Sequence, residues 1–367
     1  MSPYYYEIAL SKIPHVGPVS ARLLISYCGS AEAVFKEKKS KLLAIPGIGP
    51  STVDQLRIET VQKEIEQEIQ FLNKYNISAL YYLDKAFPSR LKHFSDIPIL
   101  LYYKGNGDLN QLRTVAIVGT RNVTEYGKMV THRIITELKS AEVVIVSGLA
   151  YGVDTIAHRQ CIQEEIPTIG VLGHGLDKMY PASNKSLADK MIFNGGLLTQ
   201  FGINTKPDRE NFPARNKIIA ALADATIVIE SRKKGGSIIT AEFANEYNKD
   251  VFAVPGRIND EFSEGCNELI RLNKAMILHS AEDLMEVMQW KLDKKELFSK
   301  RRAELVFDLE PDENSVVNVL DRENKIHVDL LHKKLNFTPG LLAAILLNLE
   351  FKGVIKELPG KYYLLNN

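Results

Sequence analysis

Short, uninterrupted apolar runs recur through the middle of the chain, and each is followed by a Gly-containing or polar turn and then by an amphipathic segment. Runs of Val, Ile and Leu without polar alternation are typical of strands buried on both faces, so the pattern predicts a mostly parallel sheet covered by helices. The predicted strands, all within residues 113–290, are TVAIVG, EVVIVSG, PTIGVLG, GLLTQF, ATIVIES, DVFAVPG and AMIL. This α/β arrangement is Rossmann-like, and in such sheets ligands bind at the carboxyl ends of the strands.

Residues 1–70 have helical patterns that follow two similar turns. IPHVGP (Ile13–Pro18) and IPGIGP (Ile45–Pro50) each place a Gly-containing turn before a helix. The repeat indicates a tandem helix-hairpin-helix (SAM-like) domain, whose turns expose backbone N–H groups that can bind a phosphate. Simple packing of a small helical domain is an equal alternative, because Pro50 lacks one of those donors. Residues 71–112 contain short apolar runs broken by prolines and predict a connector with a strand or two.

The C-terminal part predicts a separate small domain beyond a charged linker. The linker, residues 291–311, is rich in Lys, Arg and Glu. Residues 312–367 then predict three helices and the two-stranded wing VIKELPGKYYLL, which together make a winged helix, with Thr338 as N-cap of the third helix. That helix normally enters the DNA major groove, but Gly340–Phe351 contains no Lys or Arg. We therefore expect it to contact a protein.

Composition restricts the possible ligands. The chain has 46 Lys and Arg against 45 Asp and Glu, so any site for an anion must be local. Cys28, Cys161 and Cys266 have no metal-ligand spacing, and we expect neither a metal nor a cofactor. The N-terminus lacks the pattern of a signal peptide, and no apolar run is long enough to span a bilayer. We expect a cytoplasmic protein without membrane insertion.

Candidate anion-binding residues follow the ends of the predicted strands. The first turn, GTRNVTEYG, carries Arg121 where a dinucleotide-binding turn would have glycines. Between Asn204 and Lys234 there are seven basic residues against four acidic ones. Phe212 lies among these charges, which is typical of single-stranded nucleic-acid sites, where bases stack on aromatic rings. The alternative for Phe212 is a hydrophobic staple on a helix that starts at Pro213.

Two further segments after the strands could contribute to an anion site. Arg215 and Asn216 are predicted in the first turn of the helix that starts at Pro213, although Arg215 could instead pair with an acidic neighbour, Asp208 or Glu210. The segment GGSIITAE resembles a glycine-rich phosphate loop opening a helix, with Ser237 as N-cap. Taken alone this signal is weak, because many strand-to-helix turns are rich in glycine.

The strand ends do not provide a convincing catalytic set. His158 and His174 could each act as a base, but no Ser or Cys occupies a nucleophile-elbow context and no paired carboxylates follow the strands. Asp154 and His158 lie one helical turn apart, and we expect them to fix the local turn by contact on the helix surface. We therefore predict that the protein is not an enzyme.

In combination the motifs resemble the DNA-processing protein A family (DprA, also called Smf) along nearly the whole chain. The shared segments, in family order, are GTR with a later YG, SGLAYGVDTIAH, GLDKMYP with Asn184, FPARNKIIAAL, SIITAEFA, and VFAVPGR with GCNELI. The resemblance implies a protein that binds and protects incoming single-stranded DNA during natural transformation and loads the RecA recombinase onto it. It also implies a homodimer joined through the Rossmann domain. The chain departs from the family at Tyr151, where Arg is frequent.

The strand-end positions and the resemblance together define a predicted DNA-binding set. The resemblance implies that Arg121 is the turn arginine, Arg209 the basic residue before the aromatic, and Phe212 the stacking ring. The whole set comprises Gly119, Arg121, Asn122, Tyr126, Gly148, Asn184, Arg209, Phe212, Arg215, Asn216, Lys217, Gly235, Gly236 and Ser237.

A Rossmann-fold nucleotide phosphoribohydrolase acting on nucleoside monophosphates is the alternative from another functional class. In that interpretation Arg121 and Arg215 would clamp one mononucleotide, and Glu242 would attack or orient the ribose. The flanking domains and Phe212 favour the DNA hypothesis, because a mononucleotide enzyme needs neither.

Overall fold

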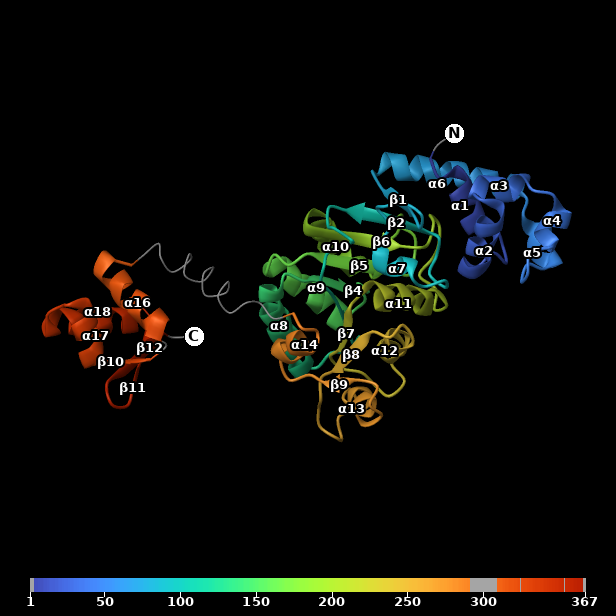
Figure 1. Ribbon diagram of the computed structural model, residues 1–367. Helices are drawn as coiled ribbons and strands as arrows, with labels where there is room; N and C mark the ends of the chain where they lie inside the picture. The colour runs from blue at the N-terminus through green and yellow to red at the C-terminus, as the bar shows by residue number, and fades with distance from the viewer. Residues whose placement is uncertain (1–2, 291–308, 324, 353, 366–367) are drawn as a thin grey trace. The chain divides into compact units, whose positions relative to one another are not determined.

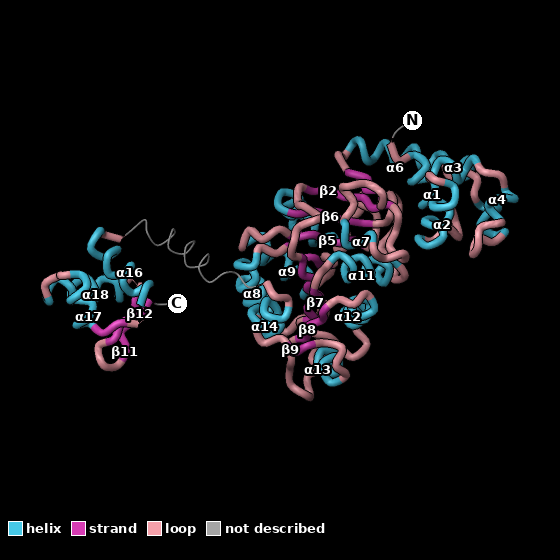
Figure 2. The backbone as a smooth tube through the Cα atoms, viewed as in Figure 1, coloured by secondary structure: helices cyan, strands magenta, loops and turns pink. Residues whose placement is uncertain are grey.

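The computed structural model describes residues 3–290, 309–323, 325–352 and 354–365, which belong to two compact units, residues 1–290 and 291–367 (Figure 1). Most of the predicted linker, residues 291–308, lies outside the described residues. Figure 2 shows how the helices surround the strands of the first unit. No helix in the described parts of the chain is long and apolar enough to cross a membrane.

A nine-stranded sheet of order β1-β2-β6-β5-β4-β3-β7-β8-β9 forms the centre of the first unit (Figure 1). The strands from β3 to β9 correspond to the seven apolar runs, and every neighbouring pair among them is parallel. Their bounds are Thr114–Val118 (β3), Val144–Ser147 (β4), Thr168–Leu172 (β5), Gly195–Thr199 (β6), Ala225–Val228 (β7), Asp250–Ala253 (β8) and Met276–Ile277 (β9). Every residue of β3 to β7 is buried, which confirms the expected doubly covered parallel sheet.

The segment predicted as a connector contributes two strands to the same sheet. Strand β1 (Ser78–Tyr81) pairs antiparallel with β2 (Leu100–Gly105), and β2 pairs antiparallel with β6. Helix α7 (Ser89–Lys92) lies between these two strands in the chain. Residues 71–112 therefore extend the sheet beyond its parallel part.

Helices cover both faces of the sheet, and alternate residues of each strand face opposite cores. In β3, Ala116 and Val118 pack with α11 and α12, whereas Val115 and Ile117 pack with α8 and α9. Full burial of one such aliphatic side chain contributes about 1.5–3 kcal/mol. The helices of this region are α8 (Glu125–Leu138), η2 (Lys139–Ala141), α9 (Val153–Gln163), η3 (Ala182–Asn184), α10 (Lys185–Met191), η4 (Ile192–Asn194), α11 (Asn211–Leu222), α12 (Gly236–Glu246), α13 (Glu264–Arg271) and α14 (Ala281–Val287).

The N-terminal residues form the predicted helical domain, which packs against β1 and β2 through a shared core. Gly17 and Gly49 cap the helices after the two similar turns, and both helices have proline at their first position. Both turns therefore lack the backbone N–H donor that a proline removes, and not the second turn alone. The helices are α1 (Tyr5–Lys12), α2 (Pro18–Cys28), α3 (Ala31–Lys36), α4 (Lys39–Leu43), α5 (Pro50–Gln55), η1 (Ile58–Thr60) and α6 (Gln62–Lys74).

A buried carboxylate links this helical domain to the segment that follows β6. Glu68 of α6 lies 2.9 Å from the Lys12 ammonium and accepts a hydrogen bond of 3.0 Å from the backbone N–H of Ile203. A Cβ atom on Gly202 would lie 2.4 Å from Glu68 Oε2, so glycine makes this close approach possible. The helical domain therefore holds the segment that leads into α11.

The second unit is a winged helix, as predicted. Its third helix begins after Thr338, whose hydroxyl accepts a hydrogen bond from the backbone N–H of Leu341. The apolar runs did not predict the short strand β10, which joins the two strands of the wing in a sheet of order β10-β12-β11. The elements are α16 (Pro311–Glu323), β10 (Ile326–His327), α17 (Val328–Leu335), α18 (Pro339–Phe351), β11 (Ile355–Leu358) and β12 (Tyr362–Leu365).

Candidate nucleic-acid interface

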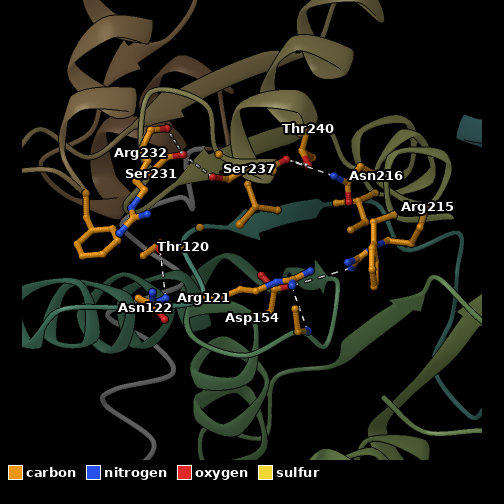
Figure 3. A pocket seen from close by; sticks show the side chains of 18 residues that line it. Thr120, Arg121, Asn122, Asp154, Arg215, Asn216, Ser231, Arg232, Ser237 and Thr240 are labelled. Carbon is orange, nitrogen blue, oxygen red and sulfur yellow. Dashed lines mark hydrogen bonds and ion pairs between the residues drawn. The ribbon is translucent and has the colours of Figure 1, made fainter. Parts of the chain in front are cut away.

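A pocket of about 280 Å³ lies at the carboxyl ends of β3 and β7, between α9, α11 and α12 (Figure 3). Members of the predicted set that line it are Gly119, Arg121, Asn122, Phe212, Arg215, Asn216, Gly235, Gly236 and Ser237. The predicted set does not contain the other lining residues, which are Val118, Thr120, Ala150, Asp154, Ile219, Ser231, Arg232, Thr240 and Phe262. The pocket therefore collects side chains from segments that are up to 144 residues apart, from Val118 to Phe262.

The turn that carries Arg121 is held in place by hydrogen bonds to Thr124 and to Glu230. Thr124 caps α8 by accepting a hydrogen bond of 3.1 Å from the N–H of Gly127. The buried Glu230, just beyond β7, accepts hydrogen bonds from the N–H of Thr124 (2.9 Å) and from its hydroxyl. The carbonyl of Glu230 accepts another from the N–H of Thr120 at 2.7 Å. These bonds fix the backbone on both sides of Arg121.

Arg121 and Phe212 form a pair at one end of the pocket. The guanidinium carbon of Arg121 lies 5.2 Å from the centre of the Phe212 ring, and that of Arg215 lies 5.9 Å from it. Arg121 is exposed, whereas Phe212 is partly buried. Two cations near one ring combine an electrostatic attraction with a flat surface, and both features suit a nucleotide.

The start of α11 excludes the alternative interpretation of Phe212. The helix begins at Asn211 after the cap residue Glu210, two residues earlier than the sequence suggested. A hydrophobic staple joins the residue before the cap to the fourth helical residue, which here are Arg209 and Ala214. Phe212 occupies neither position and is instead a lining residue of the pocket. For the same reason Arg215 and Asn216 belong to the second turn, not the first.

A buried ion pair lies beneath the aromatic ring. Arg215 Nη1 lies 4.0 Å from Asp154 Oδ2 and donates a hydrogen bond of 3.2 Å to the carbonyl of Val171. The carboxylate that pairs with Arg215 is thus Asp154. The alternative that the sequence suggested, a pair with Asp208 or Glu210, was wrong. Asp154 also accepts a hydrogen bond of 3.2 Å from the N–H of Ala150.

Burial shifts the titration of both members of this pair. Desolvation raises the pKa of Asp154, and the nearby Arg215 acts in the opposite direction. Desolvation also lowers the pKa of Arg215. Arg215 is only 5% exposed, and its Nε atom has no hydrogen-bond partner among the described residues.

Gly148 and His158 lie close to this ion pair but are not among the residues that line the pocket. A Cβ atom on Gly148 would lie 1.4 Å from Arg215 Nη1, so glycine leaves the space that the guanidinium occupies. The predicted contact between Asp154 and His158 was wrong, because His158 Nδ1 instead bonds to Thr168 Oγ1 at 2.7 Å. Burial, followed by the charge of Arg215, lowers the pKa of His158 to about 3.

Other members of the predicted set lie away from the pocket lining. Asn184 is buried and donates hydrogen bonds to the carbonyl of Leu149 and the hydroxyl of Thr155. Lys217 pairs with Asp96 at 2.8 Å. The Tyr126 hydroxyl donates to the carbonyl of Pro255 at 3.1 Å, and Arg209 is exposed in the segment before α11.

The glycine-rich turn is placed as predicted, but its capping residue is Gly235 and not Ser237. Ser237 is the second residue of α12, and its hydroxyl donates a hydrogen bond of 2.8 Å to the Ser231 hydroxyl. Asn216 of α11 donates to the carbonyl of Gly236 at 3.2 Å. The N-terminus of α12, with its partial positive charge, therefore lines the pocket.

The lining residues give little support to a mononucleotide hydrolase. Glu242, the residue that such an enzyme would use on the ribose, is exposed on α12 and lies 3.7 Å from the Lys274 ammonium. The lining carboxylate is Asp154, which is already paired with Arg215. Within the described ranges, no three His, Cys, Asp or Glu side chains are grouped as metal ligands.

Three segments of the chain match known families. Residues 78–289 match the family described as DNA recombination-mediator protein A. Residues 301–361 match the DprA winged helix domain, and residues 7–60 match a SAM-like helix-hairpin-helix tandem.

Individual relatives agree with these matches. Protein Smf of Synechocystis sp. is 35% identical over 287 residues, which cover 76% of this chain and 71% of the relative. The crystal structure of DNA processing protein A from Streptococcus pneumoniae aligns with a TM-score of 0.68 at 35% identity, over 78% of this chain and 98% of that one. DNA processing protein A from Helicobacter pylori, whose structure is described in terms of its single-stranded DNA binding mode, aligns with a TM-score of 0.53 at 31% identity, over 59% of this chain and 96% of that one. The chain belongs to the DNA-processing protein A (DprA/Smf) family.

Proposed function

We propose that the protein binds single-stranded DNA at the carboxyl edge of its sheet, protects the bound strand without cleaving it, and passes it to a RecA recombinase during natural transformation in the cytoplasm. The observation that carries the proposal is the exposed Arg121 guanidinium beside the Phe212 ring at the mouth of the pocket. A guanidinium can bind a backbone phosphate with two N–H groups, and a ring can stack with any base. The relationship to the Helicobacter pylori protein supports the choice of ligand.

The arrangement of charge in the pocket suits a polymer whose phosphates are accessible. Arg121, Arg215 and Arg232 line the pocket together with one carboxylate, Asp154. These cations lie near the N-terminus of α12, whose first backbone N–H groups carry a partial positive charge. The net charge of the whole chain is only +1. Binding therefore depends on a local site and not on a general attraction between opposite net charges.

The first prediction compares two forms of DNA. The protein should bind an oligo-dT more tightly than a duplex of the same length, because the ring of Phe212 can stack only with an unpaired base. The logarithm of the binding constant should fall linearly with the logarithm of salt concentration, with a slope of about −0.7 for each phosphate neutralised. Fluorescence anisotropy titrations at several salt concentrations measure both quantities. Equal or tighter binding of the duplex would contradict the proposed function.

We also propose that the protein forms a homodimer through the free edge of the sheet. Strand β9 is the last strand of the sheet, and its residues Met276 and Ile277 are exposed, as are Ile258, which follows the adjacent strand β8 in the chain, and Leu272, which precedes β9. An exposed apolar edge strand is a favourable surface for association. A dimer formed there would present two pockets to one DNA strand, which favours binding of long strands.

The second prediction tests this edge. Ile277→Asp should convert a dimer to a monomer, because a carboxylate in an apolar interface loses its hydration without gaining a partner. Sedimentation equilibrium measures the mass of the particle in solution. The matched control is Phe193→Asp, which replaces another exposed apolar side chain, on η4, and should leave the mass unchanged. A wild-type protein that is monomeric at micromolar concentration would refute the proposed dimer.

A further inference from the structure

A second arginine–aromatic pair lines the same pocket. The guanidinium carbon of Arg232 lies 5.0 Å from the centre of the Phe262 ring. Arg232 follows β7, and Phe262 belongs to the loop between β8 and α13. Figure 3 shows Arg232 and Arg215 at opposite ends of the pocket. The geometry thus repeats, from different elements, the pairing of Arg121 with Phe212.

The second pair is held in a defined orientation. Both ends of the Arg232 guanidinium contact the Glu261 carboxylate, at 3.0 Å through Nε and 3.1 Å through Nη2. The N–H of Ser231 donates a hydrogen bond of 2.6 Å to the carbonyl of Phe262, and the N–H of Gly265 donates one of 2.9 Å to the carbonyl of Ser231. A two-point contact of this kind fixes the plane of the guanidinium. The backbone bonds hold the Phe262 loop against the strand end that carries Arg232.

The region between the two pairs has features that suit a phosphodiester group. The N-terminus of α12 lies there, with Gly236 and Ser237 lining the pocket. Arg215 is more than nine-tenths buried, lines the pocket, and has an Nε–H without a hydrogen-bond partner among the described residues. The positive charge of Arg215 and the N-terminus of α12 would both attract a phosphate group bound there.

We propose that the pocket binds two consecutive nucleotides of one strand, with one base on the Phe212–Arg121 pair, the next on the Phe262–Arg232 pair, and the linking phosphate near Arg215 and the start of α12. This inference rests on the proposed binding of single-stranded DNA and adds a second base site to it. The strand then runs along the edge of the sheet from β3 past β7 towards β8.

The positions of the two pairs determine the conformation that the DNA must adopt. Phe212 belongs to α11 and Phe262 to the loop between β8 and α13, and their neighbours Arg215 and Arg232 lie at opposite ends of the pocket (Figure 3). Successive bases in one strand of B-form DNA are only about 3.4 Å apart. Two bases that stack on these two rings must therefore separate from each other when they bind, which paired and stacked DNA resists.

The experiment compares Phe262→Leu, which keeps an apolar side chain but removes the ring, with Phe262→Tyr, which keeps the ring. Loss of one stacking contact should weaken binding of an oligo-dT about tenfold without changing the salt slope, and Phe262→Tyr should bind like the wild type. Arg232→Lys keeps the positive charge but loses the planar guanidinium, so it should also weaken binding at an unchanged salt slope. It serves as the second variant if Phe262→Leu does not fold. The matched control, Phe193→Leu, removes an exposed ring outside the pocket in the same way and should have no effect.

A spectroscopic measurement reports directly on the separation of the two bases. Two adjacent 2-aminopurines in an oligo-dT stack on each other when free and give a coupled circular dichroism signal. Wild-type protein should abolish that signal, and Phe262→Leu should leave most of it under saturating conditions. If Phe262→Leu and Arg232→Lys bind as tightly as the wild type, or if the wild type leaves the coupled signal intact, the second base site is refuted while binding of single-stranded DNA stands. If the wild type does not prefer single strands, the proposed function itself fails.

Discussion

Arg121→Ala is expected to weaken the binding of oligo-dT about 10- to 100-fold. The substitution removes charge-assisted hydrogen bonds to a phosphate, and such bonds contribute about 1.5–3 kcal/mol each, with every 1.4 kcal/mol equal to a factor of ten. Because one cation is lost, the salt slope should become shallower by about 0.7. Stability should change little, since Arg121 is exposed. Titrations at several salt concentrations and a thermal melt provide the measurements.

Two control variants separate charge from stacking at this end of the pocket. Arg271→Ala removes the same charge from an exposed arginine on α13, which pairs with Glu268, and should leave both affinity and salt slope unchanged. Phe212→Leu should weaken binding by about 1–3 kcal/mol, because one stacked base is lost. The salt slope should stay unchanged, because an uncharged ring displaces no counterions from the DNA phosphates. If Arg121→Ala bound as tightly as Arg271→Ala, the turn would have no part in DNA binding.

Arg215→Met is expected to lower the free energy of unfolding by about 3–5 kcal/mol at neutral pH, because it leaves the Asp154 carboxylate buried without its counter-charge. At about 2–4 °C per kcal/mol, the midpoint of the thermal melt should fall by roughly 10 °C. DNA binding should also weaken, since the Phe212 ring loses one of its two cationic neighbours. Thermal melts followed by circular dichroism measure the change in stability.

The loss of stability in this variant should depend on pH. Burial already raises the pKa of Asp154 and Arg215 opposes that shift, so removal of Arg215 raises this pKa further. The unfolded-state pKa of an Asp carboxyl is about 3.9. When the pKa in the folded state is higher, the free energy of unfolding of the protein falls as pH rises from the unfolded-state pKa to the folded-state pKa. The deficit of Arg215→Met should therefore be small in acid and should grow towards neutral pH.

A second substitution tests the cause of that loss. Asp154→Asn introduced into the Arg215→Met background removes the unpaired charge, so it should restore much of the melting temperature and flatten its dependence on pH. Asp154→Asn alone should destabilise the protein, because the buried Arg215 then lacks its counter-charge. An equal deficit for Arg215→Met at pH 5 and pH 8 would show that lost packing, and not the ion pair, causes the change.

Helical periodicity explains which basic residues of α11 reach the site. Phe212, Arg215, Asn216 and Ile219 follow the spacing i, i+3, i+4 and i+7, so they share one face of the helix and all line the pocket. Lys217 lies between these positions and pairs with Asp96 instead. The sequence contained this distinction, because the spacing alone separates Lys217 from the others. Arg209 precedes the helix and is not constrained by its period.

The second arginine–aromatic pair could not be found in the same way. Phe262 lies in the loop between β8 and α13, with no periodic pattern around it, and reaches Arg232 only because β7 and β8 are adjacent in the sheet. The pairing of Arg215 with Asp154 likewise joins α11 to α9. The sequence suggested only near neighbours, Asp208 and Glu210, as alternative partners for Arg215. Long-range side-chain pairs depend on strand order and helix packing, which local patterns do not contain.

The parallel sheet, the two flanking domains and the turns after the strands could all be predicted from the amino-acid sequence. Apolar runs specify strands buried on both faces, and parallel strands bring their carboxyl ends to one edge. Arg121, Phe212 and Gly235 could therefore be placed together before the fold was known. The three-dimensional fold was needed to show that β1 and β2 extend the sheet, and to show which charges at its edge are buried, paired or exposed. The strand order and the ion pairs depend on contacts between residues far apart in the chain. The energy of such a contact is set by burial and geometry, which local sequence patterns do not contain.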